Sequence, residues 1–286
     1  MRFFIFTLMV FFSAHAFAAE KIRAVATIFP IYDFARIVGG DDAVVSMLLP
    51  PGAESHSFEP RPSDVLTIAK SDLFFHAGVS MEPWAVEIAD GAAATSVYVV
   101  DVSKGIALVD DDPHYWLDLS YAQVMVDTIA NAFAEKDPLR ANAFRERSTV
   151  LKTELARLDA EAKALFAQCD RKVILYGGHN AFSYFARRYR LIERSPYEGF
   201  SPDAEPTPKA LMQLSNAVKE THSTVLYYEE MADPKVARII RDETGVSLVM
   251  LHGAHNVSKE ERARGVTFVS IIEDDLQKLK AGLSCK

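Results

Sequence analysis

The sequence predicts an α/β protein in which two similar βα lobes are joined by one long helix. Short hydrophobic strands alternate with helical stretches in both halves of the chain, which is typical of parallel βα units. The segment 138–168 between them has a helical apolar pattern and no glycine or proline after its start. We therefore expect an N-terminal lobe at 19–137, a connecting helix at 138–168 and a C-terminal lobe at 169–286.

The first half opens with a strand at 22–29 and a short helix at 30–38. A Pro-Pro-Gly turn follows the next strand, at 43–49, and stiffens the loop after it. The remaining expected elements of this half are a helix at 63–69 and strands at 73–76 and 97–102.

The second half repeats this alternation. Glu205-Pro206-Thr207-Pro208 precedes a helix and a strand, just as Glu59-Pro60-Arg61-Pro62 does in the first half. This match indicates two related lobes. The expected strands are 173–178, 224–228 and 246–251, and the expected helices are 181–189, 208–220, 235–244 and 271–283.

Residues 1–18 have the pattern of a secretory signal peptide. Arg2 precedes the apolar run Phe3–Phe12, and Ala16-Phe17-Ala18 resembles a cleavage site. The alternative, a membrane anchor, is disfavoured because about 20 apolar residues are needed to span a bilayer. The residue directly after the predicted cleavage site is Ala19 and not a cysteine that could carry a lipid. We therefore expect an exported periplasmic chain without a lipid anchor.

Charge and cysteine content narrow the class of protein. Removing residues 1–18 takes away Arg2 alone among charged residues, so the formal charge goes from −8 to −9. Such an acidic chain is a poor partner for nucleic acid. In an exported protein, Cys169 and Cys285 are expected either to form one disulfide or to remain two unpaired thiols.

Three histidines lie in polar loops that follow hydrophobic strands: His56, His114 and His179. Loops at the carboxyl ends of parallel strands are where ligands bind in α/β sheets. Imidazole is the commonest side-chain metal ligand, and three converging imidazoles suit zinc. The alternatives are a surface role for His56 and a capping or packing role for the other two.

A fourth ligand is expected from the segment after the last strand. His252 follows that strand directly and is the first candidate, while His255 competes for the same role. Water in the fourth position is the other alternative. Carboxylates that would hold the ligating imidazoles are expected among Glu59, Asp118, Glu205 and Glu230.

The chain resembles the zinc-uptake solute-binding proteins of ABC transporters, in the cluster A-I family of metal receptors with a helical backbone. The resemblance covers nearly all of the chain after residue 18, with its motifs in the family's order. The matching stretches are GAESHSFEPRPSDVLTIAKSDLFFHAG, MEPW, DPHYWLD, GGHNAFSYFARRY and DAEPTPKAL.

The resemblance implies a metal held in the cleft between the lobes, with His56, His114 and His179 as ligands. Manganese members tend to have a carboxylate where this chain has His179, so an imidazole there favours zinc. The family's fourth position falls near His252. His252, a nearby carboxylate such as Glu54 or Glu59, and water all remain open for it.

The implied function is that of a periplasmic receptor. It would bind Zn²⁺ with high affinity and deliver it to the transmembrane subunit of an ABC permease, as a monomer, without membrane insertion and without catalysing a reaction. The alternatives are a manganese or iron receptor of the same fold, a zinc chaperone or adhesin, and a three-histidine zinc hydrolase. A hydrolase is disfavoured because the sequence has no HExxH motif.

Overall fold

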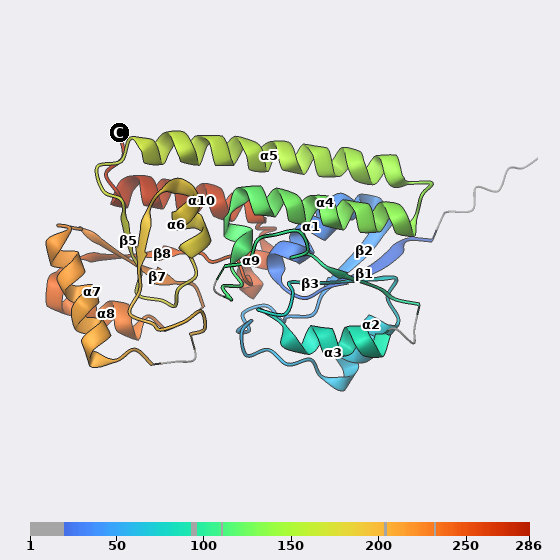
Figure 1. Cartoon of the computed structure of the whole chain (residues 1–286), viewed down its shortest axis with the longest axis horizontal. Helices are drawn as coiled ribbons and strands as arrows, with labels where there is room; N and C mark the ends of the chain where they lie inside the picture. Colours follow the sequence, from blue (N-terminus) through green and yellow to red (C-terminus); the bar gives the residue numbers. More distant parts are fainter. Residues whose placement is uncertain (1–19, 93–95, 110, 203–204, 232) are drawn as a thin grey trace, which may run out of the picture.

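Two parallel sheets lie side by side beneath a layer of long helices (Figure 1). The computed structural model describes residues 20–92, 96–109, 111–202, 205–231 and 233–286. The predicted signal peptide at 1–18 lies outside these residues.

The first sheet has four parallel strands in the order β2-β1-β3-β4. Its strands are β1 (Ile22–Ala26), β2 (Ala43–Met47), β3 (Leu73–His76) and β4 (Tyr98–Asp101). The connecting elements are α1 (Phe29–Gly39), a short 3₁₀ helix η1 (Gly40–Asp42), α2 (Pro62–Ala69) and α3 (Pro83–Ala92).

The second sheet repeats this topology. It is built from β5 (Val173–Leu175), β6 (Ile192–Arg194), β7 (Val225–Glu229) and β8 (Ser247–Leu251). β5 pairs with β6 and β7 with β8, and a parallel bridge between Tyr176 and Tyr227 joins the two pairs as β6-β5-β7-β8. The connecting helices are α6 (Ser183–Tyr189), α7 (Pro208–Glu220) and α8 (Lys235–Thr244). Both sheets thus have their strands in the order second, first, third, fourth along the chain.

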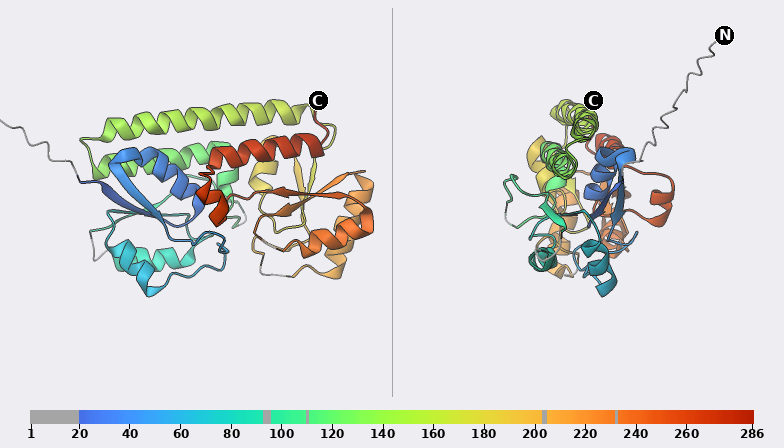
Figure 2. Two further views of the ribbon diagram at one scale, coloured as in Figure 1. Left: turned by 180° about the vertical axis from the view of Figure 1, so that it is seen from behind. Right: turned by 90° about the vertical axis from the view of Figure 1, so that its right-hand side faces the viewer.

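The long helix α5 (Ala141–Ala167) runs above both sheets, with α4 (Leu119–Lys136) and α10 (Phe268–Gly282) beneath it (Figures 1 and 2). Its 27 residues correspond to about 40 Å at 1.5 Å per residue. It begins at Ala141 and not at 138, because the Asp137 carboxylate accepts hydrogen bonds from the amides of Leu139 and Arg140 and holds them in a turn.

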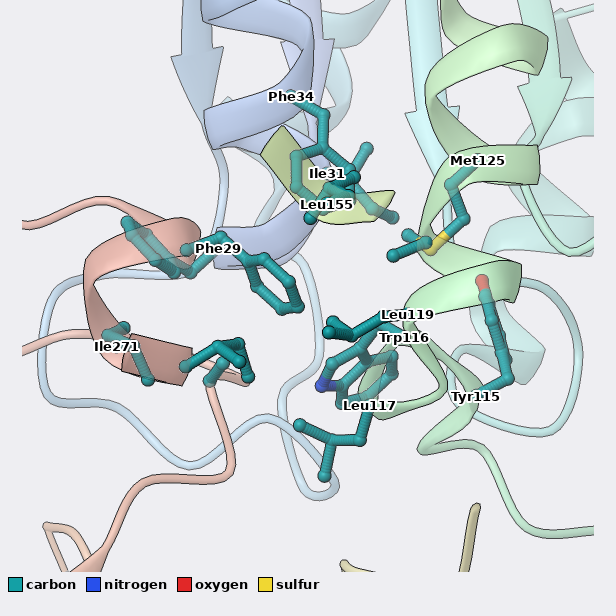
Figure 3. Packing of buried hydrophobic residues seen from close by; sticks show 14 of the residues in the cluster. Phe29, Ile31, Phe34, Tyr115, Trp116, Leu117, Leu119, Met125, Leu155 and Ile271 are labelled. Carbon is teal, nitrogen blue, oxygen red and sulfur yellow. The ribbon is translucent and has the colours of Figure 1, made fainter. Parts of the chain in front are cut away.

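The start of α10 belongs to the packing of the first half. The Phe268 amide donates to the Asp33 carboxylate of α1 at 2.9 Å, and the Phe34 and Phe268 rings meet edge to face. Side chains from α1, the 3₁₀ helix η2 (Tyr115–Leu117), α4, α5 and α10 pack together in one buried cluster (Figure 3). The predicted lobe boundaries stay a prediction, since the last helix contacts both halves.

Two further findings bear on the predictions. Cys169 and Cys285 form a disulfide, which ties the C-terminus to the end of α5. Among the described residues, none of the helices combines the length and the apolar character needed to cross a bilayer.

Candidate metal site

Four histidines from four loops meet between the two sheets. Each loop follows a strand, at the carboxyl edge of its sheet, where parallel topology gathers loops together. His56 lies between β2 and α2, His114 between β4 and η2, His179 between β5 and α6, and His255 between β8 and α9 (Lys259–Ala263).

The spacing of the ring nitrogens fits a small cation. One ligand atom from each of the four rings lies within 4.8 Å of the other three. The Nε2 atom of His114 is 3.2 Å from Nε2 of His56 and 3.2 Å from Nε2 of His179. Nitrogens placed tetrahedrally around zinc at 2.0–2.1 Å are about 3.3 Å apart. The cluster therefore needs little rearrangement to hold such an ion.

Buried carboxylates hold the opposite ring nitrogen, Nδ1, of three of the four histidines. The pairs are His114 with Asp112 at 2.8 Å, His179 with Glu229 at 2.9 Å, and His255 with Glu230 at 3.1 Å. A proton on Nδ1 leaves the Nε2 lone pair for a metal, and the carboxylate makes that nitrogen a better donor. The three rings are thus oriented with their ligating atoms inward.

The Nε2 atom of His255 has no hydrogen-bond partner, although the residue is only 7% exposed. Buried polar atoms are nearly always satisfied, so an orphan of this kind needs an explanation. A metal ion at the centre of the four rings would supply the missing partner of His255. Nε2 of His252 also has no hydrogen-bond partner, but it lies outside the four rings, 3.7 Å from Oε1 of Glu261.

Electrostatics keep two of the rings neutral. Burial, with the neighbouring rings of His255 and His179, lowers the pKa of His56 to about 2. Burial, followed by the same two rings and His56, lowers the pKa of His114 well below its ordinary value. Burial alone would lower the pKa of His255, but the hydrogen bond and charge of Glu230 outweigh it, and the pKa is raised.

A cavity of about 100 Å³ adjoins His255. The described residues of its lining include the carboxylates of Glu54, Glu229 and Glu230, and none of them is a lysine or an arginine. Such a lining favours a cation over an anion. The polar groups of the site therefore match the charge of a metal ion as well as its size.

Comparison with known proteins shows which family this chain belongs to. The ZnuA family model, described as zinc-uptake complex component A, periplasmic, matches residues 24–282. The chain belongs to this family. Its fold, with two α/β lobes and one long helix, is that of solved ZnuA-like structures, so the predicted fold class is confirmed.

Several members of the family are similar over most of the chain. The high-affinity zinc uptake system protein ZnuA of Bacillus subtilis is 30% identical over 286 residues, which is 93% of this chain and 89% of that protein. The zinc-binding protein AdcA of Streptococcus pyogenes is 28% identical over 92% of this chain, but the match covers only 56% of AdcA.

Solved structures show the same likeness. The Zn(II)-bound ZnuA-like domain of Streptococcus pneumoniae AdcA has a TM-score of 0.83 at 28% identity, covering 92% of this chain and 99% of that one. The metal-dependent lipoprotein YcdH of Bacillus subtilis has a TM-score of 0.82 at 32% identity, covering 92% and 99%.

Within the family fold, His255 and not His252 lies beside the three predicted ligands. Nδ1 of His252 accepts from the Ala254 amide at 2.9 Å, and its Nε2 lies 3.7 Å from Glu261 Oε1. Nδ1 of His252 also lies 3.3 Å from Oε1 of Glu230, the carboxylate that holds His255, so His252 lies behind the cluster and not within it. Ala254 adopts a left-handed conformation with φ of 58°. This sharp turn carries the chain from His252 back to the cluster at His255, so the structure brings His255, and not the expected His252, together with the other three histidines.

Of the four carboxylates expected to hold the histidines, Glu230 contacts a histidine of the cluster. Asp118 instead caps α4 by accepting from the Ser120 amide. Glu59 and Glu205 are exposed. Glu54 accepts from the His56 amide at 2.9 Å and lines the adjoining cavity.

Asp112 and Glu229 were missed by the sequence-based prediction, although both contact cluster histidines. Asp112 lies two residues before His114, and Glu229 lies at the end of a strand. Two features of the sequence could have indicated these carboxylates: an acidic residue close to a candidate histidine, and an acidic residue at the end of a strand.

Proposed function

We propose that this chain is the periplasmic zinc receptor of an ABC transporter and that His56, His114, His179 and His255 hold the ion. One observation carries the proposal: four imidazoles converge while buried carboxylates occupy the Nδ1 atoms of three of them. The family supports it, since its members include zinc-uptake and zinc-binding proteins.

An all-imidazole donor set favours zinc over manganese or iron as the cargo. Manganese prefers carboxylate, carbonyl and water oxygens, whereas imidazole suits zinc. The carboxylates of this site lie behind the rings, on Nδ1, and not among the converging nitrogens. The proposed site is therefore selective through its donor atoms.

Four protein ligands also argue for binding and against catalysis. Structural zinc sites are closed by four protein ligands, whereas catalytic zinc keeps a position open for water or substrate. With His255 as the fourth ligand, the tetrahedral shell would be complete. We infer that this chain is not a zinc hydrolase.

Delivery would be to the transmembrane subunit of the permease, by a monomeric chain that is neither lipidated nor inserted in the membrane. A permease reconstituted in vesicles should take up zinc only when the loaded chain is added. Uptake at the same rate with free zinc alone would contradict this part of the proposal.

The test of the site is a zinc titration of the metal-stripped chain by competition with a chromophoric chelator. His255→Ala should weaken zinc binding by more than about 100-fold, because loss of a ligand's carboxylate partner alone weakens binding 10- to 100-fold. His252→Ala is the comparison variant and should weaken zinc binding less than His255→Ala does, because His252 contacts Glu230 but not the other three rings. Equal losses in both variants, or displacement of zinc by manganese, would refute the proposed site.

A further inference from the structure

The side chain of Asn256, next to His255, fastens two segments of the site together. Its amide nitrogen donates to the carbonyl of Pro50 at 2.7 Å and to that of Ala53 at 2.9 Å. Its oxygen accepts from the Val257 amide at 2.8 Å. The residue is 2% exposed, so its hydrogen bonds form out of contact with water. The loop that it holds is the loop that carries His56.

Backbone contacts strengthen the same connection. The Gly52 amide donates to the Val257 carbonyl at 3.0 Å, and the Phe29 amide donates to the His255 carbonyl at 3.0 Å. Phe29 begins α1 of the first half. The segment that carries His255 is therefore attached to the first half of the chain, although it follows the last strand of the second sheet.

The segment of the third histidine joins this arrangement. Nε1 of Trp116, two residues after His114, donates to the Gly253 carbonyl at 2.9 Å. The segments bearing His56, His114 and His255 are thus linked by direct hydrogen bonds. His179 comes from the second sheet and is held there by Glu229.

A second His-Asn pair in the chain provides an internal comparison. Asn180 follows His179, and its amide nitrogen donates to the carbonyls of Tyr197 and Gly199, each at 3.0 Å. The hydrogen-bonding pattern is the same as that of Asn256: one side-chain amide nitrogen donates to two backbone carbonyls of a loop. The loop that Asn180 holds carries no histidine of the cluster.

We propose that Asn256 is a positioning residue that holds His56 and His255 at the spacing required for four-coordinate zinc. The inference rests on the proposed zinc site and adds a determinant of its geometry. Without the two hydrogen bonds to Pro50 and Ala53, the His56 loop is released from the His255 segment. The ion would then be held by fewer imidazoles, with water completing its shell.

The test replaces the side chain and uses Co²⁺ as a spectroscopic probe alongside zinc. Asn256→Ala should weaken zinc binding about 10- to 100-fold, as loss of an outer-shell partner does. It should also convert the intense visible absorption of four-coordinate cobalt to the weak absorption of a five- or six-coordinate ion, since geometry is diagnostic of the ligand set. Asn180→Ala removes the same chemistry and should leave the cobalt spectrum unchanged.

Asn256→Ser, which retains a single short donor, is the second variant should the alanine variant not fold. In the unmodified protein, zinc should slow hydrogen exchange at the Gly52 amide. An ion bound by both His56 and His255 would stabilise the hydrogen bonds that join their two segments, including the one from Gly52 to Val257. A wild-type cobalt spectrum and affinity in a folded Asn256 variant, an equal spectral change in Asn180→Ala, or unchanged exchange at Gly52 would overturn the inference. Failure of the unmodified chain to bind zinc would instead overturn the proposed function.

Discussion

Glu229 gives the sharpest test of how the carboxylates act on the metal site. Its Oε2 accepts from Nδ1 of His179 at 2.9 Å and from the His179 amide at 3.2 Å. Replacement by glutamine keeps the shape of the side chain and removes its charge. We expect Glu229→Gln to weaken zinc binding 10- to 100-fold, or about 1.4–2.7 kcal/mol.

The magnitude follows from the distances. An ion at 2.0–2.1 Å from Nε2 of His179 lies about 6–7 Å from the Glu229 carboxylate, across the ring and its hydrogen bond. At that separation a divalent ion and a carboxylate attract by about 1 kcal/mol at a dielectric constant of 80 and by about 5 kcal/mol at 20. The expected loss of binding free energy, about 1.4–2.7 kcal/mol, lies between these two attraction energies.

The assay is competition for zinc against a chromophoric chelator at constant pH and salt. Glu198→Gln is the matched control, because Glu198 is exposed and changes the net charge of the protein equally. Equal weakening in both variants would mean that net charge alone sets affinity. Wild-type affinity in Glu229→Gln would mean that the carboxylate does not act on the ligand. Either result would refute the reasoning.

Three further predictions concern stability and protons. Burial raises the pKa of Glu82 to about 7 from 4.5, so the folded chain binds more protons than the unfolded chain between these values and stability falls as pH rises through them. Glu82→Gln should remove up to about 3 kcal/mol of this pH-dependent loss in the free energy of unfolding, measured by urea unfolding of the metal-free protein at pH 5 and 7.5. Glu87→Gln, on the exposed face of α3, is the control and should leave the loss unchanged. Replacing Cys169 and Cys285 with serine should lower the free energy of unfolding by about 2–5 kcal/mol, because the disulfide closes a loop across a sequence separation of 116. Zinc affinity, measured by competition with a chelator, should be unchanged. The raised pKa of His255 predicts that zinc binding displaces a proton from this ring and weakens as pH falls. Calorimetry in buffers of different ionisation enthalpy measures the release, and an absence of proton release at every pH tested would contradict the prediction.

Much of the fold could be predicted because local rules and tertiary packing agree. Helix α7 begins at Pro208 with Thr207 as its cap and has the bounds predicted from the sequence, 208–220. Strand β6 was missed because it has three residues at the edge of its sheet and a largely exposed face. Helix α3 was missed although Trp84, Ala85 and Ile88 have helical spacing and pack against one buried cluster. Gly91, a weak helix former, lies near its end.

The convergence of histidines was predictable up to the point where backbone geometry decides between neighbouring residues. Three histidines each follow a strand in a loop marked by glycine or proline, and the sheet topology brings them together. The choice between His252 and His255 depends on a left-handed turn at Ala254, a residue type that seldom adopts it. No pattern in the sequence announces that turn.

The continuous helix α5 gives the proposed site the character of a preorganised chelator. It crosses the molecule without an internal glycine or proline, the residues at which long helices bend most readily. A rigid span of this kind offers no low-energy hinge between the halves. The entropy of assembling the donor atoms is then lost when the chain folds and not when the ion arrives. Such a cage would hold its ion for long times, so rapid release would require a partner that distorts the loops.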